Sequence, residues 1–598
     1  MICALVILSS AMLSCSAQSD EGTTAREIVG HMSLREKIAQ LMFMDFRKWK
    51  TLGEEETIAK LALDPKYDGE PVAEMNGEIQ KMLEDYHFGG VILFSENLKN
   101  TENSVRLVRD IQRATVSGGG LPSFIGADQE GGVITRLGQG TCLPGNMAIG
   151  ATGRTDYAFE AGAITGGELD AIGINVNFSP VSDVNDNPEN PIINLRSFGS
   201  DPAIVSEMAV SMMKGIESEG VVAVGKHFPG HGNTSTDSHT SLPLVEKDLN
   251  ALRETELKPF QALIDSGVKM LMCAHIQFPK LDSTTFISTA DGQPAVIPAT
   301  FSHAILTDLL RGEMGFQGVL ITDAMSMDAI AKHIAPADAV VRALEAGADM
   351  ICMPVEVRSP EDAALIEEMI STVEAAMQRG ELPLSRIDEA ATRVVQLKID
   401  TGLLDETFAE ADDEAAVRNA LEIVGCPAHR ETEREIAEAI VRHMPASETL
   451  ERAEASPPGF INLTLKDGWL AGQVEAILAA GDRYGCIDLG RGKRTQVEFV
   501  SVNPTGPLHV GSARNAVLGD ALASVLKATG YDVQREYYIN DRGTQFENFA
   551  ATAYVRYAQA LGEAAPRAVV IEKGGGRWEG AMADLIADPA ARRAWLAL

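Results

Sequence analysis

Eight short apolar runs alternate with helical stretches between residues 27 and 405. The runs are nearly continuous in aliphatic residues and do not alternate with polar ones, which is typical of parallel strands covered on both faces. They span residues 41–45, 90–94, 123–128, 175–181, 221–227, 269–275, 318–323 and 349–354. Stretches with helical periodicity lie between them, among them 102–115, 157–171, 201–218 and 298–314. Eight strand–helix units of this length predict an α/β fold, a (β/α)8 TIM-type barrel.

Ionisable residues stand where these predicted strands end. They are Asp128, Asp183, Lys226, His227, His275 and Asp323. In a barrel the carboxyl ends of all strands share one face, so residues far apart in the chain are expected to meet in one pocket there.

The segment 225–239 carries the densest group of titratable side chains. Asp237 precedes His239 by two residues, so its carboxylate could orient the imidazole and poise a proton donor near neutral pH. The spacing alone is also compatible with a loop that binds a structural metal, or with a histidine that only forms hydrogen bonds within the fold. The seven cysteines are scattered and never in CxxC spacing, so neither a zinc site nor a disulfide framework is indicated.

Segment 225–239 resembles the signature of the β-N-acetylhexosaminidase branch of glycoside hydrolase family 3. The resemblance covers about 27–430 and extends to three other motifs: Asp128-Gln-Glu-Gly-Gly with Arg136, Arg196-Ser-Phe-Gly, and Ile-Thr-Asp323-Ala-Met. Val133 replaces an arginine that is usual in bacterial members of this branch.

The resemblance implies a role for each matched position. Asp323 would be the nucleophile and His239 the general acid/base, assisted by Asp237. The terminal N-acetylglucosamine would be held by Asp128, Arg136, Arg196, Lys226 and His227. For Asp183 and His275 two roles remain equally plausible: contact with the substrate, or lining the pocket and hydrogen bonding at the barrel rim. We expect His231 to be structural.

The implied reaction is hydrolysis with retention, through a covalent glycosyl-enzyme intermediate, without cofactor or metal. Because histidine is neutral after giving up its proton, phosphate could replace water in the second step. A β-N-acetylglucosaminide phosphorylase using the same site is therefore the alternative.

The N-terminus resembles an export signal. Residues 2–13 are apolar but too few to span a bilayer, and a polar spacer follows. We expect residues 1–26 to be a lipoprotein leader with Cys15 as the acylated residue. Cleavage after Ala17, or a buried N-terminal helix, are the alternatives. The expected location is the bacterial cell envelope, with membrane attachment only through a lipid at Cys15.

The C-terminal quarter resembles the N-terminal part of a class I arginyl-tRNA synthetase, a partial Rossmann-like domain. The motifs are 457–462, 499–512 and 535–545. They imply ATP- or arginine-binding positions at Asn503, His509, Ser512, Asn540 and Asp541. Ser512 replaces the second histidine of the family's motif and no later signature loop follows, so we expect a truncated, inactive fragment. ATP would be a cofactor only if this fragment were functional.

The sequence predicts four parts: a leader (1–26), a barrel (27–405), a helical linker (406–434) and the synthetase-like fragment (435–598). The third part is acidic, alanine-rich and helical over 408–422, which fits either a linker or a docking helix. The hypothesis is a chimera of two genes that met near residue 434. A tRNA-binding protein is the competing functional class, but the net charge of −34 disfavours binding to RNA. We prefer the interpretation of the chain as a glycosidase, whose binding partner would be a carbohydrate substrate.

Overall fold

The computed structural model describes residues 24–538 except 52, 54–55, 57, 59, 62–66, 236–241, 409–411, 458 and 502–509, and the backbone of 569–573 and 576–580. It divides into two compact units, 1–464 and 465–598. The leader expected over 1–26 therefore lies almost wholly outside the described residues.

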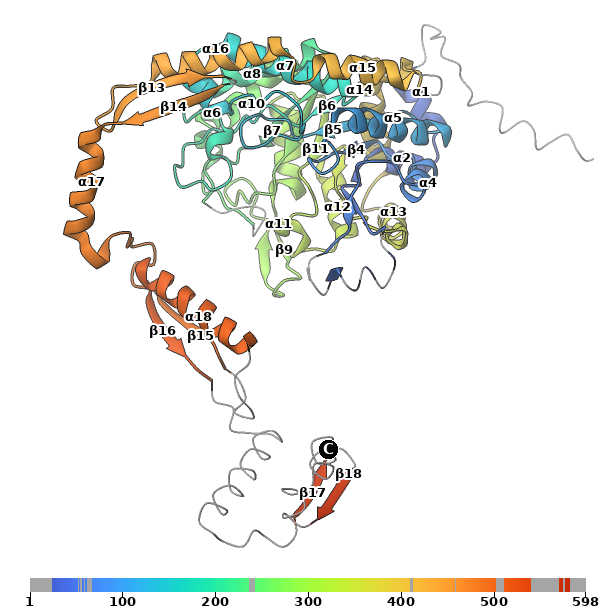
Figure 1. Cartoon of the computed structure of the whole chain (residues 1–598). Helices are drawn as coiled ribbons and strands as arrows, with labels where there is room; N and C mark the ends of the chain where they lie inside the picture. Colours follow the sequence, from blue (N-terminus) through green and yellow to red (C-terminus); the bar gives the residue numbers. More distant parts are fainter. Residues whose placement is uncertain are drawn as a thin grey trace, which may run out of the picture. The chain divides into compact units, whose positions relative to one another are not determined.

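Eight parallel strands form the centre of the first unit (Figure 1). They are β1 (Met42–Asp45), β4 (Gly90–Ile92), β5 (Phe124–Ala127), β6 (Val176–Asn177), β7 (Val222–Phe228), β8 (Met270–Cys273), β11 (Val319–Thr322) and β12 (Ile351–Cys352). The order is β11-β8-β7-β6-β5-β4-β1-β12, and a parallel bridge between Ile321 and Met350 joins the two ends. Each strand coincides with one predicted apolar run, so the predicted barrel is confirmed.

Helices surround the strands (Figure 1). They are α1 (Ala25–His31), α2 (Leu34–Gln40), α4 (Gly77–Tyr86), α5 (Thr101–Ser117), α6 (Asn146–Ala151), α7 (Thr155–Ile172), α8 (Pro202–Ser218), α9 (Leu249–Glu254), α10 (Leu257–Asp265), α11 (Asp328–Ala331), α12 (Pro336–Ala346), α13 (Ala363–Gln378) and α14 (Leu384–Asp400). Short 3-10 turns are η1 (Asn194–Arg196), η2 (Ala299–Phe301), η4 (Pro360–Asp362) and η5 (Leu403–Asp405), and η3 (Ala304–Glu313) is a π-helix of ten residues. The helix predicted over 298–314 is thus two pieces, η2 and η3.

Small residues allow the barrel interior to pack. Phe43 and Phe178 meet edge to face, with ring centroids 5.4 Å apart, across strands that are not neighbours. A Cβ atom on Gly126 would lie 2.8 Å from Phe178 and 2.9 Å from Phe43. Glycine is therefore needed there for the two rings to meet.

Two strand pairs within the described part of residues 27–405 lie outside the barrel sheet. They are β2 (Lys48–Trp49) with β3 (Glu70–Pro71), and β9 (Thr285–Ile287) with β10 (Pro294–Val296). Both pairs are antiparallel.

The segment expected as a linker is packed onto the barrel. Helix α15 (Asp413–Ile423) contacts α5 and α7, and Asp413 accepts from Arg109 Nε at 2.6 Å and Arg113 Nη1 at 2.8 Å. Helix α16 (Pro427–His443) contacts α6 and α7 and buries Ile436, Ala437 and Ala439. The boundary expected at 434/435 therefore falls inside a helix, and the compact unit continues through β13 (Leu450–Ser456) and into β14 (Phe460–Leu465).

The second unit contains a strand–helix–strand motif. Parallel strands β15 (Arg494–Glu498) and β16 (Asp532–Glu536) are connected through α18 (Val510–Ala528). Helix α17 (Asp467–Ala480), the turn η6 (Gly481–Arg483) and an antiparallel pair, β17 (Val569–Lys573) with β18 (Gly576–Gly580), complete its described elements. Both long helices expose apolar side chains, including Val474, Leu478, Val517, Leu518 and Val525. Of the helices described, none combines the length and apolar character needed to cross a membrane.

Candidate active site

A cavity of about 530 Å³ lies at the carboxyl ends of the barrel strands. Six of the predicted site residues line it: Asp128, Arg136, Arg196, Lys226, His227 and Asp323. They come from the loops after β5 and β11, from η1 and from β7, so the barrel brings together positions that span almost two hundred residues. The predicted proton-transfer pair, Asp237 and His239, lies outside the described residues.

Lys226 is the buried cation of this cavity. Its Nζ lies 2.7 Å from Asp128 Oδ1 and 2.7 Å from Glu130 Oε1, and its side chain is only 2% exposed. Burial alone would lower the pKa of Lys226, but the two carboxylates raise it above its ordinary value. Burial would likewise raise the pKa of Asp128, and Lys226 and Arg136 together hold it below the usual range. All these groups therefore stay charged, and they can donate and accept charge-assisted hydrogen bonds in the cavity.

Glu130 is a site residue that sequence reasoning missed. Arg196 binds it through two parallel bonds, Nε to Oε2 at 2.9 Å and Nη2 to Oε1 at 2.8 Å. Despite complete burial, Lys226 and Arg196 lower the pKa of Glu130. Its position two residues after Asp128, inside the matched motif, was the available signal.

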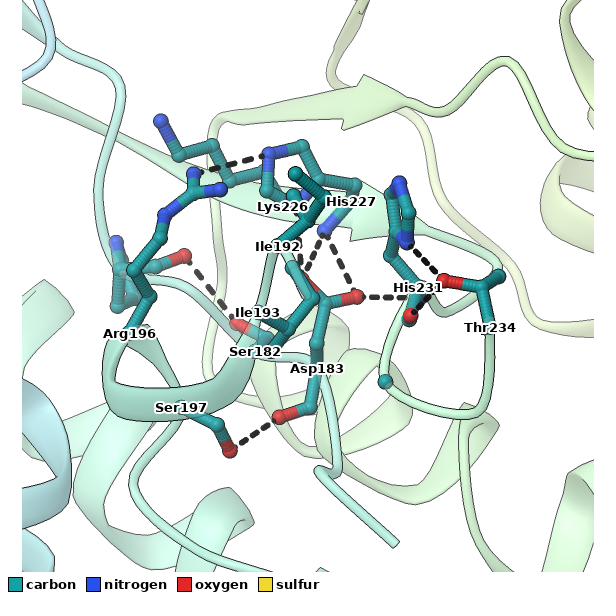
Figure 2. Close-up of polar contacts among 12 residues, drawn as sticks. Ser182, Asp183, Ile192, Ile193, Arg196, Ser197, Lys226, His227, His231 and Thr234 are labelled. Atoms are coloured by element: carbon teal, nitrogen blue, oxygen red, sulfur yellow. Dashed lines mark hydrogen bonds and ion pairs between the residues drawn. The ribbon is translucent and has the colours of Figure 1, made fainter. Parts of the chain in front are cut away.

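The ring of His227 is held from both sides (Figure 2). Arg196 Nη2 lies 3.4 Å from its Nε2, and Asp183 Oδ2 lies 2.7 Å from its Nδ1. Because a guanidinium can only donate, Nε2 accepts and Nδ1–H donates to the carboxylate. Asp183 does not line the cavity, so its contribution is to fix the orientation of His227.

Asp323 lies directly after β11, where Ala324 N donates to its Oδ1 at 2.8 Å. Burial would raise the pKa of Asp323, but its polar surroundings, the Ala324 amide among them, hold it below its usual value. The carboxylate is therefore ionised, as an attacking carboxylate must be.

The other two histidines near the site are neutral. Burial lowers the pKa of His275, whose Nε2 donates to the Ala324 carbonyl at 3.1 Å, and this ring does not line the cavity. Burial lowers the pKa of His231 to about 4, and its backbone amide donates to Asp183 Oδ1 at 2.6 Å. His231 does border the cavity. Its ring is held within the fold, because Nδ1 lies 2.8 Å from Thr234 Oγ1.

Comparison with known proteins gives this barrel a family. The model of the glycosyl hydrolase family 3 N-terminal domain matches residues 33–397. The chain belongs to glycosyl hydrolase family 3. A β-hexosaminidase A of Pseudoalteromonas piscicida is 38% identical over 371 residues, which are 61% of this chain and 60% of that protein. The chain thus spans about 60% of that relative's length.

A solved structure of a family 3 β-N-acetylglucosaminidase from Paenibacillus sp. str. FPU-7 has the same architecture. It matches with a TM-score of 0.56 and 28% identity, over 88% of this chain and 83% of that one. The expected resemblance of the first part of the chain is therefore confirmed.

The C-terminal resemblance is confirmed as well. Residues 426–465 match the model of the arginyl-tRNA synthetase N-terminal domain, and 473–564 match that of the class I catalytic domain. An arginine–tRNA ligase of Moorella thermoacetica is 52% identical over 137 residues, 23% of this chain and 24% of that protein. Of the synthetase-like positions only Ser512, buried on α18, is described, whereas Asn503, His509, Asn540 and Asp541 are not.

The mouth of the family 3 cavity carries further charged residues that sequence reasoning missed. Phe94 lies between two guanidinium groups, that of Arg47 at 4.5 Å and that of Arg136 at 5.5 Å from the ring centroid. Arg358 Nη2 lies 2.9 Å from the buried carboxylate of Asp45, at the end of β1. Asp45, like Asp128 and Asp323, is a carboxylate at the end of a barrel strand. That position was the signal from which a role for Asp45 and its partner Arg358 could have been predicted.

No cluster of three or more histidine, cysteine or acidic side chains able to hold a metal ion occurs among the residues that the structure describes. Five charged groups on the cavity wall are instead ion-paired with one another: Asp128, Glu130, Arg136, Arg196 and Lys226. Paired charges of this kind can bind the hydroxyls of a polyol, and an ionised carboxylate such as Asp323 can act as a nucleophile.

Proposed function

We propose that the chain is a retaining β-N-acetylhexosaminidase that releases terminal N-acetylglucosamine from glycans or cell-wall fragments. The observation that carries the proposal is the cavity in which ionised Asp323 faces the same space as the Lys226–Asp128–Glu130–Arg196 network. Relatives named β-hexosaminidase support the choice of sugar.

In the first step Asp323 attacks the anomeric carbon as the bond to the leaving oxygen breaks. The leaving oxygen takes a proton from His239, which Asp237 assists. In the second step His239 removes a proton from water, whose oxygen displaces Asp323 and releases the sugar with its configuration retained. The roles of His239 and Asp237 are supported by the sequence motif that contains them. Water is the only co-substrate of this scheme, so no cofactor enters it.

Hydrolysis of a chromogenic N-acetylglucosaminide by the full chain is the decisive measurement. Asp323→Asn should lower kcat by about a thousandfold or more, and His239→Ala by about 10²–10⁴-fold. Asp338→Asn, an exposed carboxylate on α12, is the matched control and should leave kcat unchanged. Unaltered turnover by Asp323→Asn would refute the nucleophile.

The same assay separates the hydrolase from a phosphorylase. Addition of inorganic phosphate should neither accelerate turnover nor yield sugar 1-phosphate. Phosphate-dependent release of sugar 1-phosphate would assign the second step to phosphate and replace the hydrolase proposal.

We propose two further properties for the ends of the chain. The apolar segment 2–13 followed by Cys15 supports export to the cell envelope, which fractionation of cells expressing the wild type and Cys15→Ala would test. Ser512, in place of a motif histidine, supports the absence of aminoacylation. Arginine-dependent exchange between ATP and pyrophosphate by the full chain would contradict that assignment.

A further inference from the structure

We infer that helix α16, which lies in the segment matched by the arginyl-tRNA synthetase model, positions the sugar-binding loops of the family 3 barrel. The inference rests on the proposed function, because it concerns how Arg136 and Arg196 are held. Two separate sets of contacts connect α16 with these arginines.

The first set meets at Glu168, on the side of α7 that faces α16. Its side chain is 2% exposed and accepts from Thr141 N at 2.9 Å, from the Thr141 hydroxyl, from Gly425 N at 2.8 Å and from His429 Nδ1 at 2.9 Å. Burial would raise the pKa of Glu168, but hydrogen bonds from His429 and Thr141 lower it. A buried carboxylate needs such donors to stay ionised, so His429 of α16 is part of what stabilises it.

Thr141 belongs to the loop that begins at Arg136. The loop is tied down at its start, where Arg136 N donates to Gln129 Oε1 at 2.6 Å, and at its end by Glu168. Between them Gly140 packs directly on Glu168, since a Cβ atom there would lie 2.8 Å from Oε2. A displacement of Glu168 would therefore be passed to the loop that presents Arg136 to the cavity.

The second set runs through α6. This short helix contacts both α16 and η1, the turn that ends with Arg196. Asn146 Nδ2 donates to the Arg196 carbonyl at 2.8 Å. A Cβ atom on Gly150 would lie 1.9 Å from the Phe198 carbonyl oxygen, so α6 packs closely against the chain just beyond Arg196. Helix α16 thus packs against the helix that holds Arg196.

The consequence is that residues 426–443, although matched to another family, serve the glycosidase site. His429 and Glu168 are positioning residues, because neither lines the cavity. Loss of the His429 hydrogen bond should weaken substrate binding more than it slows bond cleavage, since the arginines bind the sugar and Asp323 reacts.

Three variants of the full chain test this inference. His429→Ala removes the donor, and His429→Asn restores an N–H close to the position of Nδ1. His443→Ala is the matched control, because that histidine is in the same helix and, among the described residues, hydrogen-bonds the Ala439 carbonyl of its own turn, at 2.8 Å. The readouts are KM and kcat for a chromogenic N-acetylglucosaminide, and hydrogen exchange of the Thr141 amide.

We expect His429→Ala to raise KM about three- to tenfold with a smaller change in kcat, and to speed exchange at Thr141. His429→Asn should recover both values, and His443→Ala should match the wild type. An unchanged KM, or unchanged exchange at Thr141, in His429→Ala would overturn the inference while the hydrolase proposal stands.

Two further measurements decide the inference if a variant does not fold or if the wild type is inactive. If His429→Ala does not fold, Thr141→Val removes a hydroxyl from the other side of Glu168 and should raise KM in the same way. If the wild type hydrolyses no N-acetylglucosaminide, the proposed function fails, and the Thr141 exchange alone decides whether α16 holds this loop.

Discussion

Asp183 Oδ2 lies 2.7 Å from Nδ1 of His227, and the other oxygen of the same carboxylate accepts the His231 amide at 2.6 Å. One buried acid therefore fixes both the tautomer of His227 and the course of the chain after β7. Since the Asp183 side chain does not line the cavity, it acts on the cavity through the residues that it holds, His227 and His231.

Asp183→Asn should lower kcat/KM by about 10- to 100-fold, because an amide no longer enforces one orientation and tautomer of His227. Steady-state kinetics of the purified variant measure the effect. Asp186→Asn is the control, a nearby carboxylate that pairs with Lys247 at 2.5 Å and does not line the cavity. Equal losses in both variants would mean that Asp183 acts only on stability.

Glu130→Gln should lower the free energy of unfolding by about 3–5 kcal/mol, since it leaves buried Lys226 and Arg196 without a shared carboxylate. Denaturant unfolding of the barrel measures the change. Lys226→Met should be costly for the same reason, but the double variant should cost less than the sum by about 0.5–3 kcal/mol. Strictly additive losses would show that the 2.7 Å contact between the two side chains contributes nothing.

Lys398 gives a prediction for pH. It is fully buried on α14, its ammonium donates to Gln40 Oε1 at 2.8 Å, and burial lowers its pKa from 10.5 to about 7. Between these two values the unfolded chain carries a proton that the folded chain lacks. The free energy of unfolding should therefore rise with pH over this window, by up to about 1.4 kcal/mol per pH unit from this group.

Lys398→Met should remove that slope and stabilise the fold most at the lower end of the window, near neutral pH. Denaturant unfolding of variant and wild type across the window gives the difference directly. Lys214→Met, an exposed lysine on α8, should leave the difference flat. A variant with the same pH dependence as the wild type would contradict the lowered pKa.

The sequence alone predicted the barrel because parallel strands buried on both faces are continuous apolar runs, and each such run became a strand. The rule that a charged residue ending a parallel strand lies on the catalytic face predicted four of the cavity residues, Asp128, Lys226, His227 and Asp323, whereas Asp183 and His275 lie behind the wall. Arg136 and Arg196 were predicted only from the family resemblance. The roles of Asp237 and His239 stay predictions.

What the sequence could not show are pairings between distant parts of the chain. Glu130 meets Arg196 across 66 positions and Glu168 meets His429 across 261. The acidic, alanine-rich segment after residue 405 could have been a linker or a docking helix, and the pairing of Asp413 with Arg109 and Arg113 on α5 shows that it docks. Nothing in the local pattern distinguishes a carboxylate that faces water from one that faces two arginines.

The compact unit that ends at Thr464 contains both the family 3 barrel and the helix α16 that another family's model matches. The effect of a stop codon should therefore depend on whether it interrupts this compact unit, and not on which of the two families matches the codon. A nonsense allele just after codon 464 would keep every contact within this unit, whereas one just before codon 427 would remove the partner of Glu168 and the cover of α6. Selection on the proposed glycosidase activity would accordingly preserve about the first forty codons of the synthetase-like segment, which begins at residue 426.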